Sequence, residues 1–335
     1  MNSHGTRLAT VALLGGFASV IWGQGPTGSL LVIETTNRIV YARDVADYSL
    51  LATKPDSTTA VPDRNFGQTV LIGDVVSVNG MRVKGTVVQV IQKLNLRPDA
   101  PPGMAIADIA RGAWMEWYFE ILHEDGRPIG AIRASGLDQP PVQPGQSRKI
   151  LAGSYMVVGG NGAFLGARGY IGATSPLGPA RFASMAEDPS KRRVLSGGGS
   201  LALGVYVLPM FQPEIVTLAN GPAIVHSSDF SQVTLQKPAR SGEVLTLFAS
   251  GLGPTLPGVE PGEPFPSGSL QVCNSPIEVL VNGKPGEVLY AGGYPGAADR
   301  YQVNFRVPDG VAGGLVSVRL SSAWIQGPEV KLPVE

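Results

Sequence analysis

The stretch that decides the fold is GSYMVVGGNGAFLGARGYIGA, Gly153–Ala173. Two β-type runs, Ser154–Val158 and Ala167–Ile171, flank a turn whose glycines are Gly159, Gly160, Gly162 and Gly166. Glycine accepts positive φ and lets two backbones approach closely, so the stretch predicts a tight connection between two strands of one sheet. Phe164 lies between these glycines, where a loop residue is usually polar, and we expect its ring to fill a core beneath the turn.

Outward from this turn, the first two thirds of the chain read as a series of strands. The other predicted strands here are Ser29–Ile33, Arg38–Tyr41, Val70–Ile72, Asp74–Val78, Val83–Gln92, Ala113–Leu122, Pro128–Ser135, Arg181–Met185 and Ser200–Leu208. Asn79-Gly80 and Asp125-Gly126 predict hairpins in which both central residues have positive φ. Helical periodicity is weak, and Met104–Arg111 is the one short candidate. Consecutive hairpins without βαβ alternation predict an antiparallel meander that closes into a barrel.

A second set of short strands follows the change in composition at Pro209–Gln212. Turns rich in proline and glycine, such as Gly253–Ser269, separate these strands. Their spacing is typical of a β-sandwich of immunoglobulin-like type. We therefore expect two all-β domains, a barrel over residues 24–212 and an Ig-like sandwich over residues 213–335.

The N-terminal residues 1–23 have the pattern of a secretory signal peptide. Arg7 precedes the uncharged run Leu8–Trp22, which small residues follow. This apolar run is too short and too rich in glycine to cross a bilayer comfortably. We expect cleavage near Gly23 and a protein that is secreted or held in the cell envelope without spanning a membrane.

Composition excludes several classes of partner. The net charge is +0 and only 16% of residues are charged, so neither nucleic acid nor an anionic membrane surface is indicated. Cys273 is the single cysteine, which rules out an intrachain disulfide. Nothing in its neighbourhood would lower its pKa, and we expect a buried, inert thiol.

The barrel region carries a family resemblance. Gly73-Asp74, the Asn79-Gly80 turn and the motif VVGGNGAFLGARGY at 157–170 together resemble the dirigent and allene oxide cyclase superfamily, over about residues 70–208. Asn161 stands where that family usually has serine or threonine. The resemblance implies an eight-stranded antiparallel barrel, a possible homotrimer and the steering of a cyclisation or coupling reaction.

The C-terminal region carries a second resemblance, which rests on six short stretches. These are Pro238-Ala239, Gly242-Glu243, SGLG at 250–253, VNG at 281–283, YQVN at 301–304 and Val307-Pro308. They are similar to the C-terminal domain found in secreted acidobacterial (Solibacter-type) proteins of otherwise unrelated content. That module resembles an Ig-like sandwich and implies handling or anchoring.

The strand Ala113–Leu122 offers the candidate chemistry, because its residues alternate between two faces. One face carries Glu116, Tyr118 and Glu120. If this face points into the barrel, burial raises the pKa of a carboxyl group toward acid–base use. If it points outward, these are ordinary solvated charges beside exposed aromatic rings.

Arg133 is the nearest compensating charge for this face. Pairing across the Asp125-Gly126 turn predicts Tyr118 opposite Arg133 and Glu120 opposite Ala131. An interior Arg133 or Arg168 would orient an anionic ligand or pair with a glutamate.

No metal or cofactor motif is apparent. The run His123-Glu124-Asp125 lies at a hairpin tip with no second cluster of ligands, so no metal is expected. The glycines at 160–166 miss the dinucleotide-binding spacing and do not open a helix, so no cofactor is expected.

Three functions remain open. The barrel lumen binds a small apolar or amphiphilic molecule, it steers a cyclisation or coupling as an isomerase-type enzyme would, or the barrel is filled and purely structural. The contents of the lumen discriminate between them.

Overall fold

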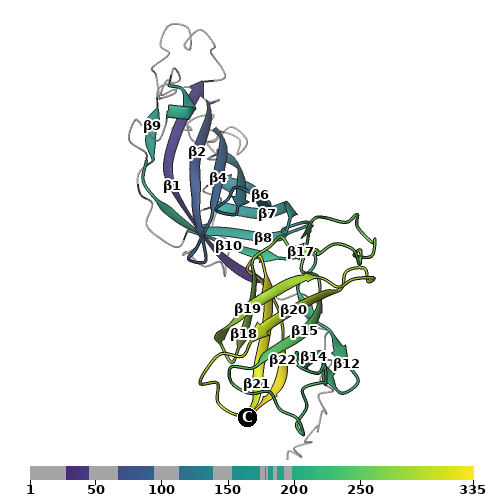
Figure 1. Ribbon diagram of the computed structural model, residues 1–335. Helices are drawn as coiled ribbons and strands as arrows, with labels where there is room; N and C mark the ends of the chain where they lie inside the picture. The colour runs from purple at the N-terminus through teal and green to yellow at the C-terminus, as the bar shows by residue number, and fades with distance from the viewer. Residues whose placement is uncertain are drawn as a thin grey trace, which may run out of the picture.

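The computed structural model describes residues 28–44, 67–93, 113–138, 153–173, 178, 180–183, 187–191 and 198–335. They form two β units, one above the other in Figure 1. The described ranges contain one short 3-10 turn, η2 (Pro189–Lys191), and no α-helix, which confirms the all-β class. The predicted signal peptide and the helix candidate Met104–Arg111 lie outside the described residues.

The first unit is a closed antiparallel barrel of eight strands, as predicted. In the order in which they pair, these strands are β1 (Ser29–Asp44), β2 (Gly67–Val78), β4 (Lys84–Lys93), β5 (Ala113–Leu122), β6 (Pro128–Asp138), β7 (Gly153–Gly162), β8 (Arg168–Ala173) and β10 (Leu201–Leu208). The ring closes because β1 pairs with both β10 and β2. Closure leaves none of these eight strands with an open edge. The short strands β3 (Met81–Arg82) and β9 (Arg181–Ala183) pair with β2 and β1, and β9 runs parallel to its partner.

Strand β1 is one long strand where two separate runs were predicted. The pairing of β1 with β2 is irregular between Glu34 and Thr35 and again between Thr36 and Ile39. Asn37, inside the second irregularity, has a φ of 51°. Bulges bend a strand and increase its twist, which explains how polar residues interrupt the apolar pattern without ending the strand.

The glycine-rich stretch joins β7 to β8, as predicted, but Gly159 and Gly160 lie within β7 and pair with β6, where the sequence predicted turn residues. Gly162 and Gly166 have φ values of 57° and 69°, where other residues are strained. A Cβ at Gly160 would lie 2.3 Å from the carbonyl oxygen of Phe164, so that glycine permits a close backbone approach, whereas Gly159 faces open space. The ring of Phe164 is 2% exposed and packs in the barrel core, which confirms its predicted place.

Of the two predicted hairpin turns, one has the expected geometry. Asn79 and Gly80 have φ values of 50° and 79°, as a two-residue turn requires. In the other turn only Gly126 has positive φ, at 91°, and Asp125 does not. This second prediction was wrong in detail, because a longer loop over residues 123–127 needs positive φ at one position only.

The second unit contains twelve short strands. They are β11 (Glu214–Ile215), β12 (Thr217–Leu218), β13 (Gly221–Pro222), β14 (Ile224–His226), β15 (Val244–Ser250), β16 (Thr255–Leu256), β17 (Val272–Cys273), β18 (Ile277–Val281), β19 (Lys284–Gly293), β20 (Tyr301–Arg306), β21 (Gly314–Ser322) and β22 (Ile325–Val334). Ten form one nearly closed sheet, and β12 and β13 form a separate pair. The likeness of this unit to an Ig-like module stays a prediction.

The two units share part of one core at the seam between them. The hairpin tip Ala323-Trp324 joins β21 to β22, whose yellow strands reach up to the barrel in Figure 1. Ala323 and Ile325 are 0% and 2% exposed and belong to the barrel's hydrophobic core, and Trp324 packs against it. The amide of Gln326 also donates to Oγ of Ser29, 2.9 Å away. The tip therefore packs into the end of the barrel that faces the second unit.

A loop contact also ties the units together. The side-chain amide of Asn274 donates to the carbonyl oxygen of Pro128 at 2.7 Å, and Nε2 of His123 lies 2.6 Å from the carbonyl oxygen of Asn274. The chain passes from one unit to the other between Leu208 and Glu214, around the predicted boundary. Independent folding of the two parts stays a prediction.

Candidate binding pocket

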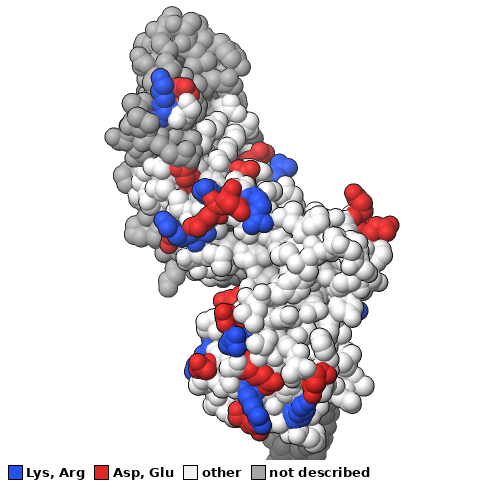
Figure 2. Space-filling model, in the orientation of Figure 1, with Lys and Arg blue, Asp and Glu red and all other residues white. Residues whose placement is uncertain are grey.

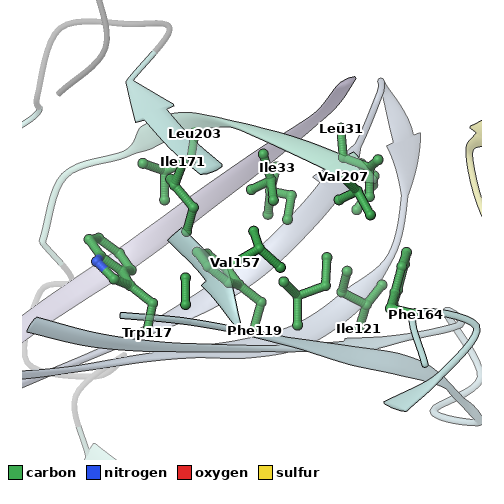
Figure 3. Packing of buried hydrophobic residues seen from close by; sticks show 14 of the residues in the cluster. Leu31, Ile33, Trp117, Phe119, Ile121, Val157, Phe164, Ile171, Leu203 and Val207 are labelled. Atoms are coloured by element: carbon green, nitrogen blue, oxygen red, sulfur yellow. The ribbon is translucent and has the colours of Figure 1, made fainter. Parts of the chain in front are cut away.

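Among the described residues, buried apolar side chains occupy the barrel interior where a ligand was expected. All eight barrel strands contribute to this core. Figure 3 shows Leu31, Ile33 and Val207 on one wall facing Phe119 and Ile121 on the opposite wall, and each is 0% exposed. Protein interiors pack about as densely as organic crystals, so a ligand here would have to displace these side chains.

The candidate site residues of β5 and β6 lie on the outer face of the barrel. Glu116, Tyr118 and Arg133 are exposed, and Glu120 is half-buried. The predicted register is confirmed, since Tyr118 pairs with Arg133 and Glu120 with Ala131. The lumenal orientation was wrong.

The reason for this orientation is the apolar area of the other face of β5. Met115, Trp117, Phe119 and Ile121 are all less than 9% exposed. Burying these four large side chains removes more apolar surface from water than burying the face with two carboxylates could. The outward alternative is therefore the correct one.

The two candidate arginines are also outside the barrel interior. Arg168 is exposed, and its guanidinium donates to the carbonyl oxygen of Val158 at 2.7 Å, which ties β8 to β7. Neither Arg168 nor Arg133 forms an ion pair with a described carboxylate. Both earlier interpretations, an interior anion site and a glutamate pair, were wrong.

The hairpin tip after β5, residues 123–127, contacts the second unit. His123 contacts the second unit, as described above, and Asp125 pairs with exposed Arg127 at 2.7 Å. Within the described ranges, no three His, Cys, Asp or Glu side chains gather as metal ligands.

A cluster of three hydrogen-bonded side chains lies inside the barrel. Gln89 and Tyr155 both donate to the thioether sulfur of Met115, at 2.9 and 3.1 Å. The neighbouring Trp117 is 5% exposed, and its indole Nε1 has no hydrogen-bond partner among the residues that the structure describes. A thioether is a weak acceptor, so the hydrogen bonds from Gln89 and Tyr155 to the sulfur of Met115 are weak.

A hollow lies at the seam, outside the barrel interior. It has a volume of about 490 Å³ and mostly apolar walls. Five parts of the chain line it: residues 162–167, 207–211, 251–265 and 299–301, and Ile325 of the hairpin tip. The glycine-rich turn, the end of β10 and two loops of the second unit therefore meet around one pocket, which we call the seam pocket.

Hydrogen bonds hold the wall of the second unit in place. The hydroxyl of Tyr301 donates to the carbonyl oxygen of Gly253 at 2.7 Å, and burial raises the pKa of this phenol, which keeps it neutral. Phe265 packs edge-on against Tyr301, with ring centroids 5.3 Å apart. A Cβ at Gly293 would lie 2.4 Å from the Phe265 ring, so glycine at that position makes room for it.

The barrel supplies the opposite wall. Phe164 and Val207 present buried apolar surface that belongs to the barrel core. Leu165 and Phe211, 59% and 67% exposed, flank it from the turn and from the segment after β10. The pocket thus combines a fixed apolar floor with exposed apolar sides.

Carboxylates are the charged groups of this pocket. Glu260, Glu263 and Asp299 line it, and none of the Lys, Arg and His residues that the structure describes does. The amide of Glu263 donates to the carbonyl oxygen of Glu260 at 3.0 Å, which places both in one tight turn. Oδ1 of Asp299 accepts the amide of Gly251 at 3.2 Å. Figure 2 shows acidic groups on the projecting loop at the right of the view.

Sequence reasoning missed this pocket. For the loop that forms much of it, Gly253–Ser269, the sequence predicts only a turn rich in proline and glycine between strands. The available signal was the same one that identified Phe164: apolar Val259 and Phe265 stand among glycines and prolines.

The fold and the pocket define an all-β protein with a filled eight-stranded barrel and an apolar hollow beside its base. Comparisons with protein-family models, with curated proteins and with solved structures find no match for this chain. The resemblances to the dirigent and allene oxide cyclase superfamily and to the acidobacterial module stay predictions.

Proposed function

We propose that the protein binds a small apolar or amphiphilic molecule in the seam pocket. The observation that carries the proposal is a hollow of about 490 Å³ with mostly apolar walls and a few polar groups. Pockets for small molecules have volumes of roughly 300–1,000 Å³ and this kind of lining. The packed barrel interior favours the seam over the lumen as the place of binding.

The barrel itself has a structural role in this proposal. Its packed core supports one wall of the pocket through Phe164 and Val207. Because side chains occupy its interior, the barrel fits the alternative in which it is purely structural. Glu116, Glu120 and Arg133, the groups that a lumenal enzyme site would need, lie on the outer face.

Binding is tested with Nile red, a neutral apolar fluorophore, and the full chain. We expect saturable binding with one site per chain. Leu165→Trp replaces the leucine side chain with a bulkier indole ring that occupies part of the pocket. We expect it to weaken Nile red binding by about tenfold or more. Leu165 is 59% exposed, so the substitution does not overfill the core.

The matched control is Leu315→Trp. Leu315 is 61% exposed and lies near the end of β21 away from the hairpin tip. Nile red binding to this variant is expected to equal that of the wild type. Equal binding by Leu165→Trp and Leu315→Trp, or no saturable binding at all, would contradict the proposal.

The remaining expectations stay proposals alongside this one. They are secretion or an envelope location after cleavage near Gly23, a homotrimer, and dirigent-like or cyclase-like chemistry. N-terminal sequencing of exported protein and a mass measurement in solution test the first two. Within the described ranges, no helix has the length and apolar character that a bilayer crossing needs.

A further inference from the structure

The charge of the seam pocket restricts what it can bind. Among the described residues, its lining includes three carboxylates, on Glu260, Glu263 and Asp299, and no basic side chain. Neither Glu260 nor Glu263 forms an ion pair with a described Lys or Arg. Glu260, Glu263 and Asp299 are exposed, so an anionic ligand would meet uncompensated negative charge at the solvent-facing edge of the hollow.

Aromatic rings stand in the same lining. Phe211 is exposed, and Phe265 and Tyr301 pack edge to face within the opposite wall. The faces of aromatic rings attract cations, most strongly those with apolar surfaces such as quaternary ammonium groups. The carboxylates and the aromatic rings around this hollow therefore both favour a positively charged ligand.

We infer that the ligand is a free amphiphile with an ammonium head group and an apolar tail. This inference rests on the proposed binding function and names its ligand class. The tail lies against the apolar floor formed by Phe164, Val207 and Ile325. The head lies beside the turn that carries Glu260 and Glu263.

The test compares three probes that share one tail: decyltrimethylammonium, decanol and decyl sulfate. Each is titrated into the full chain by calorimetry. The two ions are kept below their micelle-forming concentrations, and decanol is kept below its solubility limit. We expect the cation to bind about tenfold more tightly than decanol, and decyl sulfate to bind more weakly than decanol. Added salt should narrow the difference between the two ions.

The double variant Glu260→Gln with Glu263→Gln keeps the shape of the turn and removes two charges. Its preference for the cation over decanol should fall to about twofold. The control, Glu287→Gln with Glu329→Gln, removes two exposed carboxylates that are paired with Arg306 and Arg319 and do not line the pocket. It should keep the tenfold preference.

Two results would overturn the ammonium assignment alone: decyl sulfate binding as tightly as the cation, or an unchanged preference in the pocket double variant. Decanol and Nile red binding would then still support an apolar pocket. Failure of all three probes and of Nile red would overturn the proposed function as well.

Discussion

At the residue scale, Phe164 connects the glycine-rich turn to the barrel core. It lies in a turn and yet is 2% exposed. We expect Phe164→Ala to lower the free energy of unfolding by about 3–5 kcal/mol, the range for emptying a buried aromatic site. Denaturant unfolding measures this, with Phe182→Ala as the control, since Phe182 is 60% exposed. A loss below about 0.5 kcal/mol for Phe164→Ala would contradict the packing described here.

The thioether of Met115 accepts two buried hydrogen bonds. Methionine and leucine have similar volumes, and exchanging them in a core usually costs less than about 1.5 kcal/mol. Here Met115→Leu also removes the sulfur that accepts one hydrogen bond from Gln89 and one from Tyr155, so we expect a loss of about 1–3 kcal/mol. Met156→Leu, on a side chain that is 59% exposed, should change stability by less than about 0.5 kcal/mol. Equal effects of the two substitutions would show that the hydrogen bonds to sulfur contribute nothing.

Cys273 is half-buried, where the sequence predicted a buried, inert thiol, and its inertness stays a prediction. Burial raises the pKa of this thiol from 9.0 to about 12. Between these values the unfolded chain loses the proton and the folded chain keeps it, so stability is present below pH 9 and is lost as pH rises toward 12. Thermal unfolding of the wild type and of Cys273→Ala should therefore show a steeper alkaline loss in the wild type. Parallel pH profiles for the two proteins would show that the Cys273 thiol does not contribute to the alkaline loss of stability.

At the element scale, strand β5 shows what a sequence pattern can and cannot decide. Its alternation predicted the two faces, and the turn after it predicted the pairing of Tyr118 with Arg133. Alternation alone does not say which face lies inside. That depends on the total apolar area of each face, and here Trp117 and Phe119 outweigh the face with Glu116.

The hairpin tip between β21 and β22 is the element that ties the second unit to the barrel. Ile325 belongs to the second unit by sequence and to the barrel core by packing. We expect Ile325→Ala to destabilise the chain by about 2–5 kcal/mol and to speed hydrogen exchange of backbone amides in β5. Val318→Ala, which removes a side chain from the core of the second unit, should speed exchange mainly there. Unchanged exchange in β5 of the Ile325 variant would mean that the tip does not support the barrel.

At the scale of the whole molecule, the seam pocket exists because two units meet. Each of its walls looks unremarkable in sequence: a glycine turn, the end of a strand and a loop rich in proline and glycine. Strand patterns predicted both units, because each pattern is local. The pocket was not predictable in this way, since it depends on the packing of Ile325 and its neighbours against a barrel formed far away in the sequence.

The most direct test of the seam pocket is to find where a bound apolar molecule lies. An alkyl probe with a photoreactive diazirine is bound to the full chain, illuminated, and located by mass spectrometry of the peptides. The account predicts labelling within residues 162–167 and 251–265, and competition by Nile red. Labelling concentrated on the inward-facing residues of β5, such as Phe119 and Ile121, would place the ligand in the barrel lumen and contradict it.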